Sequence, residues 1–202
     1  MKTILTLMLM VSGAVSVLAQ GVVDFRNGGV TFSTVADRRV YGFNAASGCG
    51  PLVGTNYVAS LFYVAGANVD LNPSTSGTQA GALAHFRSPT TSSPGIWLNP
   101  VEVGNNRILD GVDVGQVATL QVRVWDITKY ATYLDAFAHG EYTASAPFLY
   151  TVPQPLSFPD AYYMDNLRAF AALSSPEPSA PIFLALGAVA WLWLRMRRQG
   201  KD

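Results

Sequence analysis

Charged residues are scarce in this 202-residue chain: they make up 13% of it, against about 25% in typical soluble domains. The 13 basic and 13 acidic side chains cancel, so the formal net charge at pH 7 is zero. A nucleic-acid-binding protein needs a basic patch to meet the phosphates. The composition therefore argues against nucleic acid as a partner.

Cysteine and histidine are scarce as well. The single cysteine, Cys49, excludes an intramolecular disulfide, and in an exported protein such a residue is a free thiol or forms an intermolecular pair. His85 and His139 are the two histidines, and both are remote in sequence from the thiol that they would have to activate as a nucleophile. We interpret Cys49 as a small, half-buried residue in a glycine-rich turn.

Enzyme motifs are missing too: no G-x-S-x-G, HExxH, P-loop or CxxC pattern occurs. The acidic residues are scattered, with no pairing typical of glycosidase carboxylates. Asp110 and Asp113 fall in a glycine-containing stretch and could offer oxygen ligands to Ca²⁺. The rest of a calcium-loop spacing is absent, so we interpret both as turn residues. The sequence predicts no cofactor, no metal site and no enzymatic activity.

The N-terminus has the features of a secretory signal peptide. Lys2 supplies the basic start, and an uncharged apolar run follows over residues 4–17. Compact residues precede a cleavage site for signal peptidase between Ala19 and Gln20, so we predict that residues 1–19 are removed. The alternative is an uncleaved N-terminal anchor, for which the apolar run is short.

The middle of the chain, residues 20–173, has the composition of a β-rich domain. Runs such as "TNYVASLFYVAG" and "SAPFLYTV" are rich in β-branched and aromatic residues, and loops such as "SPTTSSPG" separate them. Asn27 and the two glycines after it favour a tight turn, so we expect a hairpin there. The stretch "YYMDNLRAFAAL" is expected to supply the last strand.

One strand, in "ATLQVRVWDI", alternates cleanly. Leu120, Val122 and Val124 share one face, which we expect to meet the core. Asp126 at the end of the strand is expected to cap the turn or helix that follows. The other face is expected to meet solvent, as in a half-buried strand, and carries Gln121, Arg123 and Trp125.

One helix is expected across "TKYATYLDAFAHG". Thr128 is in position to cap its start, and Gly140 to end it in the left-handed conformation. The stripe of side chains at helical spacing predicts a face packed on a sheet. This stripe consists of Tyr130, Tyr133, Leu134 and Phe137. We therefore predict an antiparallel β-sandwich or jelly roll with one short helix.

Aromatic side chains leave a carbohydrate-binding module open as an alternative function. Rings that are exposed on a sheet can stack on sugars, whereas in most sheet proteins such rings belong to the core. The candidates for such a platform are Tyr41, Tyr57, Tyr63, Trp97 and Trp125.

The C-terminal segment, residues 174–202, is set apart from the domain. A Pro-Glu-Pro triplet precedes an apolar run at about 180–194, and a basic tail follows over 195–202. The run gives roughly 20 Å of helix, so it spans a bilayer core of about 30 Å only with snorkelling and local thinning. By the positive-inside rule the basic tail stays cytoplasmic and the domain lies outside.

The triplet, the apolar helix and the basic end together resemble the PEP-CTERM sorting signal of Gram-negative bacteria. In that family an exosortase, an inner-membrane cysteine peptidase, processes the protein near the triplet and releases it to the cell surface or matrix. The resemblance implies a transient membrane anchor at about 180–194. It also implies a recognition motif, which consists of Pro176, Glu177 and Pro178. The stop-transfer cluster that it implies consists of Arg195, Arg197 and Arg198.

The middle of the chain is similar to a group of uncharacterised PEP-CTERM proteins, through "VDFRN", "YVASLFYVAG" and "TLQVRVWD". That resemblance implies no activity. The sequence thus favours a non-enzymatic protein that is exported through the inner membrane and sorted by an exosortase. Two alternatives stay open: a module that binds extracellular polysaccharide, and an envelope protein that stays anchored in the membrane.

Overall fold

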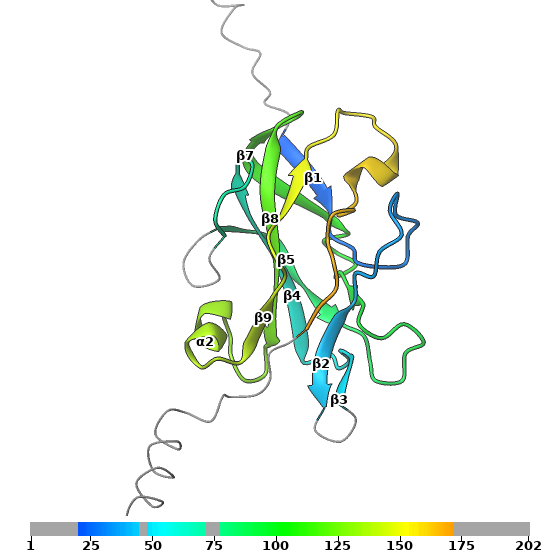
Figure 1. Cartoon of the computed structure of the whole chain (residues 1–202), viewed down its shortest axis with the longest axis vertical. Coiled ribbons are helices and arrows are strands. Elements are labelled where there is room, and N and C mark those ends of the chain that lie inside the picture. The colour runs from blue at the N-terminus through cyan, green and yellow to red at the C-terminus, as the bar shows by residue number, and fades with distance from the viewer. Residues whose placement is uncertain (1–19, 45–47, 72–76, 172–202) are drawn as a thin grey trace, which may run out of the picture.

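Antiparallel strands make up most of the structure, a computed structural model that describes residues 20–44, 48–71 and 77–171 (Figure 1). Within these ranges one α-helix, α2 (Tyr133–Ala138), and one 3-10 helix, η1 (Pro159–Tyr162), accompany the strands. The prediction of a mainly β fold with one short α-helix is confirmed.

The largest sheet has six strands, and its two central members, β4 (Tyr57–Ala65) and β8 (Val117–Asp126), pair antiparallel over nine positions of β4. Both were expected as strands from their β-branched and aromatic residues. Four further strands flank this pair: β5 (Thr78–Phe86) beside β4, β6 (Trp97–Leu98) at the edge, and β9 (Tyr142–Ala144) and β10 (Phe148–Thr151) along the other side of β8.

Two smaller sheets complete the fold. β1 (Gln20–Asp24) pairs antiparallel with β7 (Asn106–Asp113). β2 (Val40–Asn44) pairs antiparallel with β3 (Gly48–Pro51) and parallel with β11 (Phe170–Ala171). The expected last strand is therefore reduced to the two residues of β11.

The hairpin expected at Asn27 is wrong. β1 pairs with β7 instead, and residues 25–39 contain no strand. Asn27 is buried: its amide nitrogen donates to the carbonyl oxygens of Arg38 (3.0 Å) and Gly95 (2.9 Å), and its amide oxygen accepts from the Trp97 backbone N–H (3.2 Å). Asn27 thus ties together three segments that are distant in sequence.

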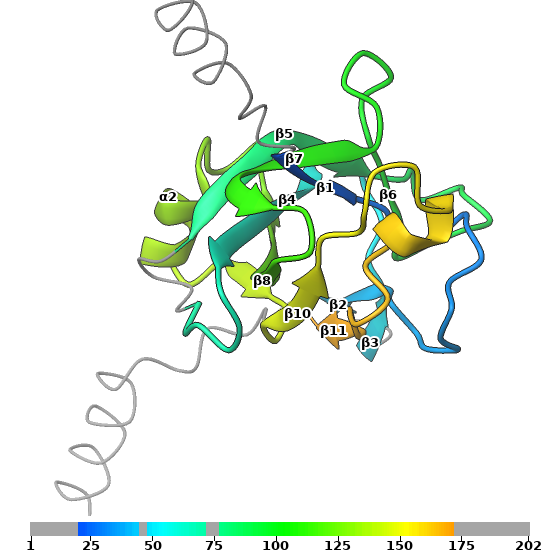
Figure 2. The ribbon, with the colours of Figure 1, turned by 90° about the horizontal axis from the view of Figure 1, so that it is seen from above.

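The inner face of the central sheet, the face toward β1 and β7, carries the main hydrophobic core. Leu120, Val122 and Val124 are buried there, as predicted. Figure 2 shows β2, β11 and η1 on this side of the sheet and α2 on the other. Other members of this core are Val23, Leu61, Leu109, Met164 and Leu167.

The outer face of the central sheet, the face toward α2, is buried as well, which corrects the expected half-buried strand. Gln121 and Arg123 are each only 2% exposed, and Trp125 is buried beside them. Tyr133 and Ala136 of α2 pack against this face. β8 is therefore covered on both sides.

α2 is shorter than expected and has a different cap. The hydroxyl of Thr132, not of Thr128, accepts from the Asp135 backbone N–H (3.2 Å). Leu134 is 59% exposed, so only part of the expected stripe faces the sheet. Gly140 has φ +71°, which confirms the left-handed glycine just beyond the helix.

The first and last described strands lie at opposite ends of β8 (Figure 1). Near the start of β8, the Val152 backbone N–H donates to the Gln116 carbonyl (2.9 Å), and a Cβ on Gly21 of β1 would come within 2.8 Å of Val152. At the far end, the carbonyl of Ala171 accepts from the hydroxyl of Thr143, which belongs to β9. About seven strand residues, or roughly 23 Å, separate the two ends.

The predicted signal peptide and the predicted sorting segment lie outside the described residues, as do Ala19, the Pro-Glu-Pro triplet and the basic cluster. In the part of the chain that the structure describes, no helix has the length and apolar character needed to cross a membrane.

Candidate functional site

The five aromatic residues expected to form a sugar platform are not brought together on the surface. Tyr63, Trp97 and Trp125 are buried in the core. Tyr41 and Tyr57 are half-buried and lie on different sheets, on β2 and β4. The platform in that form is excluded.

A different set of rings gathers on the surface around α2. Tyr130, Phe137 and Tyr142 are half-buried and pack against the cluster beneath the helix. The ring centroids of Phe137 and Tyr142 lie 4.8 Å apart, and Tyr142 meets the buried Tyr133 edge-on at 5.5 Å. These three rings, with the polar side chains of Lys129, His139 and Glu141, are called the α2 rim below.

The polar groups of the α2 rim are tied to one another. The ammonium of Lys129 donates to Glu141 Oε2 at 2.5 Å, and the Tyr130 hydroxyl donates to Glu141 Oε1 at 3.2 Å. The hydrogen bond from Lys129 is the main cause that holds the pKa of Glu141 below its usual value. A charged pair beside flat rings can hydrogen-bond the hydroxyl groups of a bound polar ligand.

His139 adds a further ring to the α2 rim. It stacks on Tyr130 with centroids 4.9 Å apart and planes 26° apart. Its Nδ1 lies 2.8 Å from the carbonyl oxygen of Asp135. A carbonyl can only accept, so Nδ1 is the donor in this contact. The exposed ring of His139 thus extends the aromatic surface beside Tyr130.

Asp126 builds the turn that leads into the α2 rim, as the sequence predicted. Its carboxylate accepts from the backbone N–H (2.9 Å) and hydroxyl (2.6 Å) of Thr128 and from the amide of Asn56 (2.7 Å). Burial alone would raise the pKa of Asp126, but these hydrogen bonds outweigh it and lower the pKa. The indole N–H of Trp125 donates to the Tyr130 carbonyl (3.0 Å) and fixes the same turn.

A buried polar layer lies beneath α2, and it was not predicted from the sequence. The guanidinium of Arg123 lies 4.0 Å from the ring centroid of Phe62 and 4.8 Å from that of Tyr133. Its Nε donates to Gln121 Oε1 (2.9 Å), and the Gln121 amide donates to the Ser145 carbonyl (3.1 Å). Burial lowers the pKa of Arg123 and raises that of Tyr133.

Two hydroxyl groups in this layer have no hydrogen-bond partner among the described residues: those of Ser60 and Tyr133. Ser60 lies directly opposite Arg123 in the β4–β8 register. Both side chains are buried, so neither hydroxyl can turn to solvent. The α2 rim therefore sits on a layer that is tightly packed but not fully satisfied in its hydrogen bonding.

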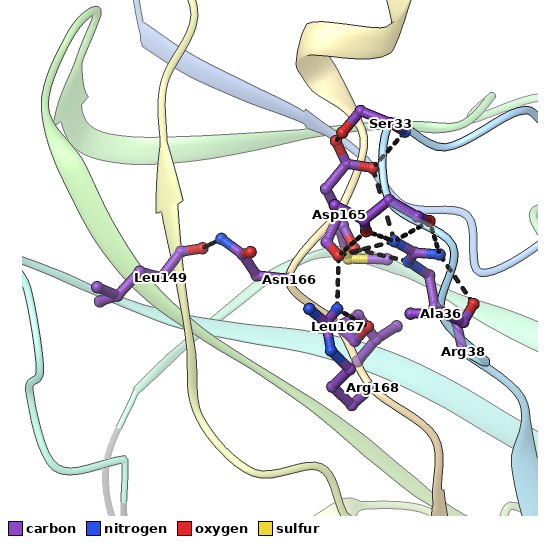
Figure 3. A network of polar contacts seen from close by, with 10 residues as sticks. Ser33, Ala36, Arg38, Leu149, Asp165, Asn166, Leu167 and Arg168 are labelled. Carbon is purple, nitrogen blue, oxygen red and sulfur yellow. Dashed lines mark hydrogen bonds and ion pairs between the residues drawn. The ribbon is translucent and has the colours of Figure 1, made fainter.

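Arg38 forms a second polar centre, apart from the residues of the α2 rim (Figure 3). Its guanidinium donates to the carbonyl oxygens of Ala36 (3.0 Å) and Asp165 (2.7 Å) and lies 3.9 Å from the Phe32 ring. The Ser33 hydroxyl donates to the Asp165 carboxylate. These contacts bind the loop before β2 to the segment before β11, so this centre serves the fold.

The remaining sequence candidates lie apart. Asp110 lies within β7 rather than in a turn, whereas Asp113, the last residue of β7, opens the turn that follows: its carbonyl accepts from the Gln116 backbone N–H (3.0 Å). Cys49 is exposed on β3, so its expected half-burial is wrong. His85 lies on β5, where its Nδ1 contacts the Thr55 carbonyl at 2.8 Å. Across the described ranges no three His, Cys, Asp or Glu side chains come together as metal ligands.

The chain matches no protein-family model, and no curated protein or solved structure with which it was compared is similar to it.

Proposed function

We propose that this chain is an exported, non-catalytic protein whose β-rich domain is sorted by an exosortase-type peptidase to the cell surface or matrix. One observation carries the proposal. Among the described residues, the first strand begins at Gln20, directly after the expected signal-peptide cleavage site, and the last ends at Ala171, shortly before Pro176. The described strands therefore lie between the two segments that the sequence assigns to export and sorting.

The roles of the acidic side chains support a structural rather than a catalytic use. Asp24 pairs with Arg26, and Asp37 accepts from the Tyr41 hydroxyl. Asp126 holds a turn, as described above, and Asp135 accepts from Thr132 at the start of α2. Each of these carboxylates accepts a hydrogen bond from a residue only a few positions away in sequence, and so stabilises a turn, a helix cap or a strand end.

The finer parts of the proposal follow from the sequence. The β1–β7 pair would form the second layer of a β-sandwich or jelly roll. Residues at about 180–194 would form the transient membrane helix, with Arg195, Arg197 and Arg198 on the cytoplasmic side. Signal peptidase would act between Ala19 and Gln20, and the exosortase near Pro176, Glu177 and Pro178.

Mass spectrometry of the mature protein tests this proposal. We expect an N-terminus at Gln20 and a C-terminus near the Pro-Glu-Pro triplet, with Glu177→Ala blocking the second cut. Glu102→Ala, at an exposed position in the domain, is the matched control and should be processed normally. An intact C-terminus that is unaffected by Glu177→Ala would contradict sorting. Full-length protein confined to the inner membrane would instead support a permanently anchored envelope protein.

The α2 rim favours a second function, the binding of extracellular polysaccharide. Its half-buried rings and its Lys129–Glu141 pair combine an apolar surface with hydrogen-bonding groups. Electrophoresis in gels that contain a neutral β-glucan tests this function. We expect Tyr130→Ala to abolish retardation of the protein, and Tyr41→Ala, on a different sheet, to leave it unchanged. Equal mobility in gels with and without the glucan would contradict this function.

A further inference from the structure

The loop after β10 carries a pair of large apolar side chains into solvent. Leu156 is 101% exposed and Phe158 83%. No charged residue occurs over residues 153–159. Leu156 and Phe158 are called the apolar tip below. Leu156 and Phe158 are two positions apart in sequence, and grouped exposed apolar side chains mark an interaction site more often than an isolated one does.

The loop is held rigid behind the apolar tip. The carbonyl oxygen of Gln154 accepts three hydrogen bonds: from the Ser157 backbone N–H (3.1 Å), from its hydroxyl (2.6 Å) and from the Tyr162 hydroxyl (3.2 Å). Prolines at positions 153, 155 and 159 fix their own φ angles. The tip is therefore displayed in one conformation, and little order has to be gained when it binds.

Leu156 is also held in an unfavourable backbone conformation. Its φ is +64°, in the left-handed region where glycine is usual and leucine is not. Strain of this kind persists where the surrounding structure enforces it, and it concentrates at sites of function. Leu156 is therefore held in a strained backbone conformation, and its side chain is fully exposed, so packing within the described residues does not offset the cost of that strain.

The small area of the apolar tip indicates which class of partner it can bind. A stable protein interface buries about 800 Å² on each side, whereas one large side chain buries about 150–250 Å². The area that two side chains can bury is therefore too small to hold two free proteins together. It is enough when the protein is already tethered to its target, because the tether keeps the effective concentration of the two surfaces high.

A lipid surface fits this setting. Tyr162 and Tyr163 follow the loop and are half-buried, and the Tyr162 hydroxyl bonds to the loop at Gln154. Tyrosines are enriched at the headgroup level of a bilayer. Nine residue spacings join Ala171 to position 180, where the predicted membrane segment begins, and fully extended they reach roughly 30 Å. That reach exceeds the roughly 23 Å that separate the first and last described strands along β8, so a domain tethered by the C-terminal segment can bring its far end to the same membrane.

We infer that the apolar tip inserts into the bilayer that holds the C-terminal segment of the same chain. Leu156 and Phe158 would enter the acyl boundary, and the domain would lie along the membrane rather than stand away from it. This inference rests on the proposed function for the existence of the membrane segment. It adds a second membrane contact, at the domain, to the one that the proposed C-terminal helix makes.

Labelled full-length protein in phosphatidylcholine vesicles tests the inference. An environment-sensitive fluorophore is attached at Phe158→Cys in a Cys49→Ser background, and quenching by brominated lipid is measured. The matched control is Val101→Cys, at an equally exposed apolar position on a different loop. We expect quenching several-fold stronger at position 158 than at position 101. Leu156→Cys gives a second probe if the first substitution disturbs folding.

The outcomes separate this inference from the proposed function. If the labelled chain floats with the vesicles and position 158 is quenched, both stand. If the chain floats and positions 156 and 158 are no more quenched than position 101, the tip is not a membrane contact, although the anchor remains. If the chain does not float, the membrane segment fails, and the insertion of the tip fails with it.

Discussion

The two faces of the central sheet are equally buried but built from different chemistry. The inner face is apolar throughout, with residues such as Leu61 and Leu120 packed against β1 and β7. The outer face is just as closed, yet it holds Ser60, Gln121 and Arg123 beneath the aromatic side chains of α2. One strand, β8, thus contributes to an apolar core on one side and to a polar, aromatic layer on the other.

This difference shows what an alternating sequence does and does not specify. Alternation fixes which side chains share a face, because successive residues point to opposite sides of a strand. It does not fix whether the polar face meets water. Here the long side chain of Arg123 stacks on Phe62 and Tyr133, and its hydrogen bonds make burial tolerable.

Removing a large apolar side chain from the inner face should have the largest effect. Leu120→Ala is expected to lower the free energy of unfolding by about 2–5 kcal/mol, because it creates a cavity in a packed core. Urea denaturation followed by circular dichroism measures the change. Leu134→Ala, on the exposed side of α2, is the control and should stay within about 0.5 kcal/mol of the parent protein. A small loss for Leu120→Ala would mean that the inner face is not the main core.

Removing the buried charge from the outer face should cost less. Arg123→Met keeps an apolar stem but deprives Gln121 Oε1 of its donor, so we expect a loss of about 1–3 kcal/mol. The double variant Arg123→Met, Gln121→Leu removes both partners and should recover part of that loss. The same denaturation experiment tests both variants. If the double variant is the less stable of the two, the Arg123–Gln121 contact is not the source of the cost.

Much of the fold could be predicted because it depends on short stretches of sequence. The β-branched and aromatic runs located β4, β8 and β10, and the alternation identified the inner face of β8. The pairing of β1 with β7 could not be predicted. A local turn signal at Asn27 competed with it, and in the structure that side chain bridges distant segments instead.

The candidate site was predictable only in its local parts. The Asp126 turn and the Gly140 helix end depend on residues that are neighbours in sequence, and both predictions are confirmed. The helical stripe included Tyr130 and Phe137, but nothing local indicated that Tyr142 would join them from β9. Which rings remain exposed depends on the packing of α2 on the sheet, and sequence spacing does not determine that.

The turn that holds the α2 rim should respond to acid. The pKa of Asp126 is lowered in the folded protein, so its contribution to stability is complete above the unfolded pKa of about 3.9 and is lost as pH falls through the folded value. We expect Asp126→Ala to cost about 0.5–2 kcal/mol at pH 7, with the difference from the parent shrinking below pH 4. Urea titrations at pH 7 and pH 3 measure it. A difference that is the same at both pH values would show that the carboxylate charge has no part in the turn.

Removing the unpartnered hydroxyl groups of the outer face should have the smallest effect, and of the opposite sign. Tyr133→Phe deletes a buried hydroxyl that has no hydrogen-bond partner in the described part of the chain, and it leaves the ring contacts with Phe62, Trp125 and Tyr142 in place. Because a buried polar group without a partner is costly, we expect the free energy of unfolding to stay the same or to rise by up to about 1 kcal/mol. Ser60→Ala is the parallel test on the facing strand. A clear loss of stability in both variants would mean that these hydroxyls are satisfied in solution, and the contrast between the two faces would then be smaller than the structure indicates.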